Sequence, residues 1–430
     1  MVSGASKGLR IRARSCNTNY RNEPTNVKNR VLLVHDHYRS SVPSGENQVV
    51  EVESELLRHR GHQVDEFFRY NDQILNRGIR GTISGALSTP WNPFSARAIK
   101  KAVNRLQPDV VHVHNTFPLL SPAIFHAIGS QTTRVLTLHN YRLFCPAAIP
   151  LRDGSVCTEC IEGHTVRPSL QHGCYRGSRL ATLPLAFKVA LHRHLGTWTK
   201  KVDAFIVLTE FQRDLMIKAG LPARLVHVKP NFYPGKPAML PWKDRRPTVV
   251  FVGRLTKEKG VETLVRAWAD WGSAAPELKI IGDGESKEQL KKMVSARPDL
   301  PIQFLGQLTP AKTQKIISQS RLLVLPSECY EGFPLVLREA FAFGTPVAVS
   351  DIGPLPLLVR QGVNGVLFSP GDARDLREVV QNLWNNENEL CHLASGARHS
   401  FDTLYTEDVN YKLLMEIYTQ ATEVRRHRKR

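Results

Sequence analysis

One stretch of the chain, VVFVGRLTKEKG at residues 249–260, decides the fold. Its four apolar residues, followed by Gly253, predict a short buried strand, and the apolar pattern of residues 261–270 predicts a helix after the loop. Gly253 allows the backbone to come close to a ligand. The start of a helix favours anions, and Arg254 and Lys259 add positive charge around the same loop. The stretch therefore predicts a diphosphate site in an α/β domain, with a solvated basic loop as the alternative.

A second stretch, EGFPLVLREA, covers residues 331–340 and follows a predicted strand at 322–325. On a helix that starts near Pro334, Glu339 lies about one turn in, while Glu331 stays in the loop before the helix. A loop carboxylate is placed to accept hydrogen bonds from sugar hydroxyls, and a helix carboxylate one turn later can hold a ribose diol. Two solvated glutamates beside a helix start are the alternative.

Strand and helix patterns alternate on both sides of these stretches. A first series has a helix at 46–60 and strands at 31–34, 62–68, 109–113, 134–138 and 204–208. A second series has strands at 248–252, 278–281, 302–305, 322–325 and 347–349. Between the two series, six prolines fall within residues 222–247, where no period is visible, and they indicate a linker. The sequence thus predicts two doubly wound α/β domains that face a cleft.

This pattern divides the chain into six parts. The predicted parts are a disordered basic arm at 1–29, an N-terminal domain at 30–229, a linker at 230–247, a C-terminal domain at 248–406, a helix at 407–424 that crosses back to the N-terminal domain, and a basic tail at 425–430. In the N-terminal domain, His35, His114 and His139 each follow a predicted strand. Ligands of open parallel sheets bind at the carboxyl ends of strands, so these histidines predict one wall of a site.

Residues 253–260 and 331–340 resemble the two most specific motifs of the retaining GT-B glycosyltransferases, the group 1 or family 4 type that includes bacterial mannosyltransferases and sucrose synthases. The second stretch fits the E-x7-E motif of that family, and the resemblance extends over roughly residues 30–424. It implies two Rossmann-like domains and a nucleotide-sugar donor, a UDP- or GDP-sugar, held mainly by the C-terminal domain. It also implies transfer of a hexose with retention, without a catalytic divalent metal.

The resemblance implies roles for individual residues. Arg254 and Lys259 would contact the donor phosphates, Glu331 the sugar ring and Glu339 the ribose, while His139 would lie near the anomeric centre. We therefore expect His139, Glu331, Arg254 and Lys259 to take part in catalysis. The other donor-binding positions that it implies are Gly45, Gly253, Gly306, Leu308, Phe333, Pro334 and Leu335.

Four positions depart from the family pattern. Ser44 precedes Gly45 where the family often has two glycines, and Asn140 follows His139 where aspartate is common. Pro354 and Leu357 stand where the family commonly has the second glycine and the glutamate of Gly-Gly-x-x-Glu. Proline removes a backbone donor and fixes φ, so we expect the details of donor recognition to differ.

The chemistry of glycosyl transfer explains why such a site needs basic residues. Cleavage of a glycosyl phosphate leaves negative charge on the departing diphosphate, which Arg254, Lys259 and helix N-termini would stabilise. One well-placed donor of this kind contributes ~2.7–4 kcal/mol. The resemblance implies attack on the same face of the sugar, with a diphosphate oxygen as the base and His139 as a hydrogen-bonding group.

Four of the seven cysteines fall within 30 residues, in the pattern C-x11-C-x2-C-x13-C: Cys145, Cys157, Cys160 and Cys174. A C-x2-C pair with two further cysteines suits a tetrahedral structural zinc site. Zinc would close the insert at 145–174, which follows His139 and has little core of its own. His164 and His172 are alternative ligands. An iron–sulfur site and four unrelated buried thiols are the other interpretations.

The net charge is +19, and 11 of these charges lie in residues 1–30 and 424–430. Basic ends of this kind are usually solvated, but they also attract anionic lipid or nucleic acid. No apolar run reaches the roughly 18–20 residues that a membrane span requires, and no apolar segment of a secretory signal is visible. We therefore expect a cytoplasmic protein.

Residues 180–202 form an apolar stretch that carries Lys188, Arg193, Lys200 and Lys201. As an amphipathic helix it would rest on an anionic membrane that holds a lipid-linked acceptor, whereas the alternative is a core helix with a basic outer face. The expected function is a retaining glycosyltransferase that acts on a lipid-linked or polysaccharide-precursor acceptor.

Three other functions compete with this expectation. The first is a GT-B enzyme that acts on a free sugar or small metabolite, and the second is a degenerate binding protein. The third, a zinc-stapled nucleic-acid-binding protein, would leave both motifs unexplained, so we expect no specific binding of nucleic acid.

Overall fold

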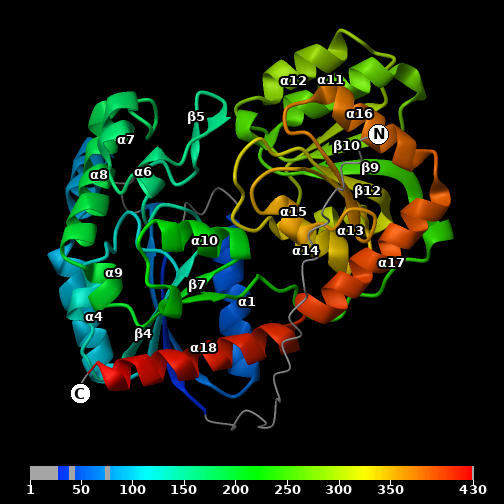
Figure 1. The fold of residues 1–430 in the computed structure, drawn as a ribbon. Helices are drawn as coiled ribbons and strands as arrows, with labels where there is room; N and C mark the ends of the chain where they lie inside the picture. Colours follow the sequence, from blue (N-terminus) through cyan, green and yellow to red (C-terminus); the bar gives the residue numbers. More distant parts are fainter. Residues whose placement is uncertain (1–27, 38–43, 73–77, 429–430) are drawn as a thin grey trace, which may run out of the picture.

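The computed structural model describes residues 28–37, 44–72 and 78–428, except for the side chains of residues 79, 80 and 82. The chain forms two α/β lobes that stand side by side (Figure 1). The predicted class of two doubly wound domains is therefore confirmed. Of the predicted basic arm, only the last two positions fall within the described residues.

The N-terminal domain is built on a six-stranded parallel sheet in the order β2-β1-β3-β4-β7-β8. Its central strands are buried on both faces, because helices cover the sheet on either side. The strands are β1 (Arg30–His37), β2 (Gln63–Tyr70), β3 (Val110–Val113), β4 (Thr133–Leu138), β7 (Ala204–Val207) and β8 (Val226–Val228). The main helices are α1 (Gly45–His59), α3 (Gly78–Ser88), α4 (Pro93–Leu106), α8 (Arg179–His194) and α10 (Glu210–Lys218).

The C-terminal domain repeats this design, with six parallel strands in the order β11-β10-β9-β12-β13-β14. The strands are β9 (Arg246–Val252), β10 (Glu277–Ile281), β11 (Ile302–Gly306), β12 (Ser320–Leu325), β13 (Val347–Ser350) and β14 (Gly365–Phe368). The helices are α11 (Val261–Trp271), α12 (Lys287–Ser295), α13 (Pro310–Gln319), α14 (Leu335–Ala342), α15 (Leu355–Leu358), α16 (Ala373–Trp384) and α17 (Glu387–Leu404).

In the two large sheets, the sequence did not predict two of the strands, β8 and β14. Both lie at the edge of their sheets and are only three and four residues long. A run this short gives no distinct pattern of apolar residues. In addition, β9 begins at Arg246, so the strand extends two residues into the predicted linker.

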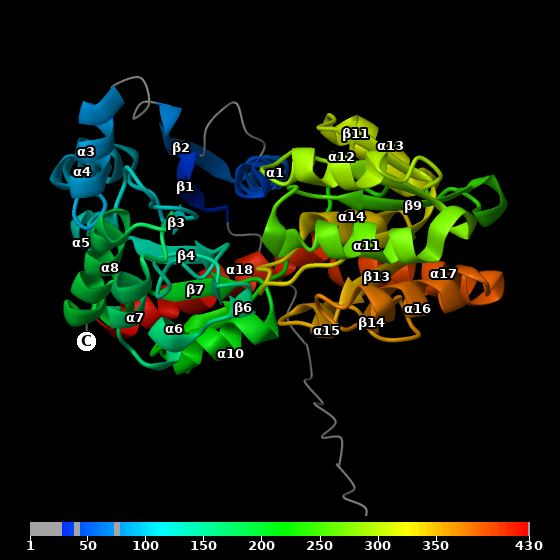
Figure 2. The same ribbon diagram turned by 90° about the horizontal axis from the view of Figure 1, so that it is seen from above.

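The last helix, α18 (Glu407–His427), runs from the C-terminal lobe along the N-terminal lobe and packs against β4 and β7 (Figures 1 and 2). The predicted crossing helix is present, but it ends at His427 instead of 424. Arg425 donates to the backbone carbonyl of Gln131, and Arg428 Nη1 lies 3.0 Å from Asp203 Oδ1. A solvated basic end was therefore the wrong expectation for Arg425 and Arg428, because carbonyl and carboxylate partners hold them on the domain. Arg426 and His427 are exposed.

The insert at 145–174, which lies between β4 and α8, has only short elements of its own. It contains a small antiparallel hairpin and two short helices: β5 (Leu151–Arg152), β6 (Ser155–Val156), α6 (Glu159–Glu162) and α7 (Arg167–His172). It covers one end of the N-terminal sheet, beside α8 and α10.

The apolar stretch at 180–202 is divided between α8 and α9 (Thr197–Lys200), which Gly196 separates with a φ of +63°. The prediction that Lys188 lies on a basic outer face was wrong. Its side chain is buried beside the ring of Phe117, and burial lowers the pKa of Lys188 to about 7. The exposed face of α8 is apolar instead, with Leu180, Leu183 and Phe187. Among the described residues, no helix combines the length and apolarity that crossing a membrane requires.

Candidate active site

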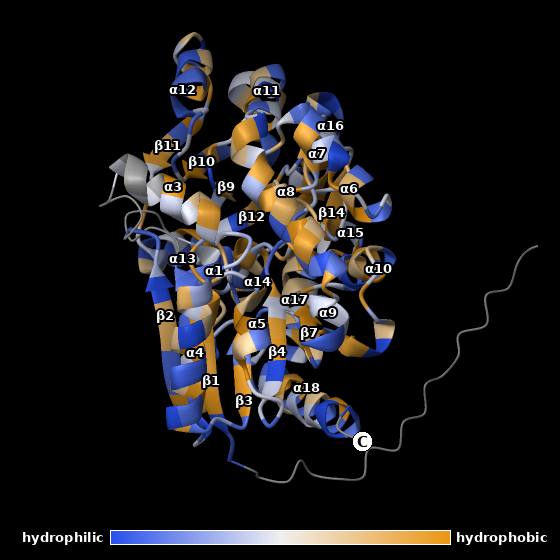
Figure 3. Ribbon diagram, turned by 90° about the vertical axis from the view of Figure 1, so that its left-hand side faces the viewer, coloured by the Kyte–Doolittle hydropathy of each residue, from blue (hydrophilic) through white to orange (hydrophobic). Residues whose placement is uncertain are grey.

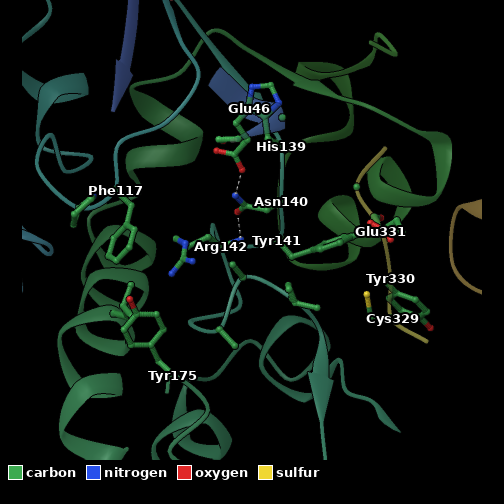
Figure 4. A pocket seen from close by; sticks show the side chains of 18 of the residues that line it. Glu46, Phe117, His139, Asn140, Tyr141, Arg142, Tyr175, Cys329, Tyr330 and Glu331 are labelled. Carbon is green, nitrogen blue, oxygen red and sulfur yellow. Dashed lines mark hydrogen bonds between the residues drawn. The ribbon is translucent and has the colours of Figure 1, made fainter. Parts of the chain in front are cut away.

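A cavity of about 960 Å³ lies between the two domains (Figure 4). Its walls are loops at the carboxyl ends of parallel strands, which is where ligands of open α/β sheets bind. The C-terminal domain contributes the loop after β9 and the loop between β12 and α14. The N-terminal domain contributes the start of α1, the loop after β4, and parts of α3 and α8.

Seven of the predicted site residues line this cavity: Gly45, His139, Arg254, Lys259, Glu331, Phe333 and Leu335. They come from four segments of the chain, so the fold brings together most of what the motifs indicated. The other five predicted residues do not line it: Gly253, Gly306, Leu308, Pro334 and Glu339.

The loop after β9 is held in place by close backbone packing. Gly260 has a φ of +65°, and a Cβ at this position would lie 1.8 Å from the backbone oxygen of Pro326. The backbone N–H groups of Gly253 and Leu255 donate to carbonyls at the end of β10 and just beyond it. Lys259 therefore stands on a fixed turn directly before α11, whereas the side chain of Arg254 is 58% exposed and pairs with Glu258 at 3.3 Å.

Lys259 and Glu331 form an ion pair at the centre of the cavity wall, with 2.6 Å between Nζ and Oε1. Ser327 Oγ donates to the same carboxylate oxygen at 2.6 Å. Burial by itself raises the pKa of Glu331, but the charge of Lys259 and these hydrogen bonds outweigh it and lower that pKa below its usual value. Glu331 is therefore an anion at neutral pH, with a lysine beside it that can also face a phosphate.

The loop that carries Glu331 also contacts the N-terminal domain. Tyr141 OH donates to the backbone oxygen of Glu331 at 3.0 Å. A Cβ on Gly332 would lie 2.6 Å from the backbone oxygen of His139, and a Cβ on Gly45 would lie 2.9 Å from Leu335 Cδ1. The two domains therefore touch at the site itself. At Gly332 a side chain would meet rigid backbone, whereas at Gly45 it would meet the end of the Leu335 side chain.

His139 lines the cavity, and its Nε2 lies 3.1 Å from Nδ1 of His114. Burial, followed by the neighbouring His114 and His35, lowers the pKa of His139 well below its usual value, so the imidazole is neutral at neutral pH. With Nε2 engaged, Nδ1 remains to hydrogen-bond a ligand. His114 and His35 lie behind His139 and do not line the cavity, so the predicted wall of three histidines contributes only one of them.

A buried network of charged residues holds His114, which contacts His139, in place. Lys229 Nζ donates to Glu53 Oε2 at 2.8 Å, and Glu53 Oε1 lies 3.1 Å from Nδ1 of His112 and 3.3 Å from Nε2 of His114. Glu53 Oε1 makes no well-aligned hydrogen bond at these distances. Burial raises the pKa of Glu53, but Lys229 and the two histidines lower it well below its usual value.

Among the described residues, one group has its possible ligand atoms close enough together to bind a metal ion, all within 4.8 Å of one another. The group consists of Glu53, His112 and His114. The ammonium group of Lys229 already occupies the cationic position beside this carboxylate. We therefore interpret the network as support for His139.

Glu339 lies within α14, five residues after Pro334 and outside the cavity lining. Gln314 Nε2 is 3.4 Å from its carboxylate, and burial raises the pKa of Glu339. Gly306, the last residue of β11, accepts a hydrogen bond from the backbone of Gly282 at 2.9 Å. These residues occupy the domain that would hold the nucleotide.

The opposite wall of the cavity contains residues that the sequence analysis did not single out. The guanidinium of Arg142 lies 4.3 Å from the ring centre of Phe117 and 5.8 Å from that of Tyr175 (Figure 4). These side chains come from three loops far apart in the sequence, and no local pattern indicated them. An aromatic wall with a cation can stack against a sugar ring and hydrogen-bond its hydroxyls.

The structure explains why asparagine stands at position 140, where aspartate is common in the family. Asn140 Nδ2 donates to Glu46 Oε1 at 2.7 Å, and Asn140 Oδ1 accepts from the backbone N–H of Arg142 at 2.9 Å (Figure 4). An ionised aspartate could not donate to Glu46 and would repel it. Asparagine therefore fits this site because of the glutamate that follows Gly45.

Two family models match the chain. Residues 43–234 match Glycosyltransferase Family 4, and residues 236–400 match Glycosyl transferases group 1. A sulfoquinovosyl transferase of Arabidopsis thaliana is 30% identical over 343 residues, which are 76% of this chain and 60% of that protein. The chain spans 24 to 60% of the length of the first four curated relatives that it matches.

Solved structures show the same fold. A glycosyltransferase of Rickettsia africae ESF-5 superposes with a TM-score of 0.65 at 13% identity, over 91% of this chain and 99% of that one. HepE of Anabaena, solved in complex with UDP and glucose, superposes with a TM-score of 0.60 at 18% identity, again over 91% and 99% of the two chains. The two Rossmann-like domains are thus those of the GT-B fold.

Proposed function

Since this chain belongs to the group 1 and family 4 glycosyltransferases of the GT-B fold, we propose that it is a retaining hexosyltransferase. It uses a UDP- or GDP-sugar as donor. The acceptor is a hydroxyl group of a lipid-linked or polysaccharide-precursor glycan. The observation that carries the proposal is the Lys259–Glu331 pair, which faces an aromatic wall across one cavity between the domains.

The two walls of the cavity divide the reaction between them. Lys259 and Arg254 lie where they can stabilise the departing diphosphate, and the anionic Glu331 can accept hydrogen bonds from the sugar hydroxyls. The neutral His139 can hydrogen-bond the sugar next to the anomeric carbon. The bond from that carbon to the phosphate oxygen breaks, and the bond to the acceptor oxygen forms on the same face. The acceptor proton passes to the departing diphosphate oxygen, and no step of this mechanism requires a metal ion.

Three comparisons support a nucleotide-sugar donor and a glycolipid or glycan acceptor. HepE binds UDP and glucose in the same fold, and the Arabidopsis relative is named for transfer of sulfoquinovose. A Staphylococcus aureus TarM variant, 17% identical with a TM-score of 0.54, was solved with UDP and α-GlcNAc-glycerol. We therefore place UDP-sugars first in the donor panel described below.

The lipid-linked acceptor is supported by the helices at the mouth of the cavity. Parts of α3 and α8 line it, through Gly85, Ala86 and Ala181 among others. The outer faces of α3, α8 and the start of α4 carry large exposed apolar side chains, which are Ile83, Leu87, Phe94, Leu180, Leu183 and Phe187. Hydrophobic residues recur along the ribbon of α8 (Figure 3). Arg97, Lys100 and Arg179 are exposed on α4 and α8. An apolar face with basic residues is typical of helices that rest on an anionic membrane.

Donor hydrolysis tests the transferase. The full chain is incubated with UDP-glucose, UDP-galactose, UDP-N-acetylglucosamine, GDP-mannose and ADP-glucose, and the released nucleoside diphosphate is measured. We expect turnover of one donor, and we expect Glu331→Gln to abolish it. Glu288→Gln, which removes a largely exposed carboxylate of the same domain, should leave it unchanged. Absence of both binding and hydrolysis across the panel would contradict the proposal.

Binding to lipid vesicles tests the proposal that the acceptor is lipid-linked and lies at a membrane. The protein is sedimented with vesicles of phosphatidylcholine alone and with phosphatidylglycerol added. Burial of one leucine or phenylalanine side chain contributes ~1.5–3 kcal/mol, so Leu87→Glu and Phe187→Glu should each weaken binding by roughly tenfold or more. Leu404→Glu, at an exposed position of the other domain, is the control. Equal binding of all three variants would favour the alternative, an enzyme that acts on a free sugar or small metabolite.

A further inference from the structure

We propose that Cys145, Cys157, Cys160 and Cys174 bind one structural zinc ion in the insert behind the acceptor wall. The four residues come from four different segments: the loop after β4, the end of the β5–β6 hairpin, helix α6 and the turn after α7. In the fold they all line one small cavity of about 20 Å³. A space of this size holds roughly one water-sized particle.

Hydrogen-bond donors lie beside two of the four sulfur atoms. The backbone N–H groups of Ala147 and Ala148 face the sulfur of Cys145, and both the backbone N–H and the hydroxyl of Ser169 face that of Cys160. Such hydrogen bonds stabilise a coordinating thiolate and orient it toward a metal.

Disulfide bonds, histidine ligands and an iron–sulfur cluster fit this cavity less well than a zinc ion bound by four cysteines. All six cysteines in the described ranges are free. His164 and His172, the alternative ligands, are exposed and do not line the small cavity. Four sulfur ligands select zinc or an iron–sulfur cluster, and a cavity of this size suits a single ion. Arg152 also lines the cavity, where its charge partly offsets the net negative charge of four thiolates around Zn²⁺.

Binding must draw the four segments slightly closer together. Within the described residues, no three of these sulfur atoms lie within 4.8 Å of one another. Zinc–sulfur bonds of ~2.3 Å in a tetrahedral site place the sulfur atoms about 3.8 Å apart. The thiol protons leave for the solvent as the bonds form, so binding releases up to about four protons per ion. The insert can make this movement because its hairpin strands are two residues long and its helices four and six.

The location gives the ion a role that rests on the proposed function. Ala147 lines both the zinc cavity and the large cavity, while Ala148, Ile149 and Tyr175, close to the cysteines in sequence, also line the large one. An ion that ties these segments together therefore fixes the wall against which the acceptor would bind. Loss of the ion should loosen that wall and leave the donor side, which belongs to the C-terminal domain, intact.

Metal content tests the site without reference to activity. The full chain is purified without chelators, supplied with Zn²⁺, passed through a desalting column and analysed by mass spectrometry for metals. We expect about one zinc per chain, with little in Cys157→Ser and Cys174→Ser and the full amount in Cys391→Ser, which changes a cysteine of helix α17. No bound zinc, iron with labile sulfide, disulfides between these cysteines, or equal zinc in all three variants would each overturn the proposal.

Cobalt keeps the test decisive if the serine variants do not fold. The wild-type chain is stripped with a chelator and titrated with Co²⁺, and the absorption spectrum should show thiolate-to-cobalt charge transfer and the bands of a tetrahedral ion. A spectrum without them would overturn the site.

Activity assays then separate the role of the ion from the enzyme itself. The zinc-free protein should hydrolyse donor as before but transfer to acceptor more slowly. Equal transfer with and without zinc would refute the role in the acceptor wall, whereas a lack of hydrolysis in either form would refute the proposed function.

Discussion

Replacement of Lys259 by alanine tests the central feature of the site. The Lys259 ammonium lies 2.6 Å from Glu331 and lines the cavity, and only 17% of its side chain is exposed. Removal of one fixed donor to developing negative charge costs ~2.7–4 kcal/mol in the transition state. A tenfold change in rate corresponds to ~1.4 kcal/mol, so kcat/KM should fall roughly 100- to 1,000-fold.

The same substitution should change the pH dependence. In the intact site, Lys259 holds the pKa of Glu331 below its usual value against the effect of burial. Without the lysine, burial raises that pKa, so the carboxylate takes up a proton at higher pH than before. Since the mechanism needs the carboxylate ionised, the acid limb of the pH–rate profile should move to higher pH in the variant.

The assay is release of nucleoside diphosphate from the preferred donor between pH 5 and 9. Lys257→Ala is the matched control, because this lysine lies two residues away on the same turn but is exposed and outside the cavity. Melting temperatures of both variants exclude a general loss of folding. A loss in Lys259→Ala no larger than in Lys257→Ala, or an acid limb that stays in place, would refute our account of the site.

Three further predictions follow from buried and crowded positions. Gly332→Ala should lower turnover at least tenfold without changing the circular dichroism spectrum, because its Cβ would lie 2.6 Å from a carbonyl of the opposite domain. Lys229→Met leaves Glu53 charged and unpaired in the interior, so urea unfolding should show a loss of ~3–5 kcal/mol. Burial lowers the pKa of His35 to about 3 and of His112 to about 4, below the value of about 6.5 in the unfolded chain. Below pH 6.5 the unfolded chain therefore binds more protons than the folded one, so the free energy of unfolding should fall. Each of the two histidines contributes up to ~1.4 kcal/mol per pH unit. Urea unfolding midpoints at pH 7.5 and 5 measure this loss.

The sequence predicted the loops that form the C-terminal wall of the cavity because their signals are local. The loop at 253–260 and the stretch at 331–340 each join a strand to a helix within a dozen residues, so the motif and its structural context are read together. The predicted strands around them are present, with bounds that differ by a few residues. What local patterns could not supply was the order of the strands and the short edge strands, which depend on pairing with distant partners.

The N-terminal wall could be predicted only in part. His139 was found through its position after a strand, but its support comes from Glu53 and Lys229, which are 176 residues apart in the sequence. Lys188 was misread because its helix buries a lysine beside Phe117 and exposes leucines, the reverse of the usual pattern. Side chains that meet only through tertiary packing leave no periodic signal in the sequence.

The contacts between the domains explain why the site carries glycine on both sides. Gly332 meets the backbone of the N-terminal domain, and Gly45, the first residue of α1, meets Leu335 at the start of α14. A side chain at either position would hold the walls apart, by more at Gly332, where it would meet rigid backbone. Lys259 and Glu331 could then no longer face the same ligand as His139. The motif glycines therefore set the distance between the domains, and this distance decides whether donor and acceptor groups meet in one cavity.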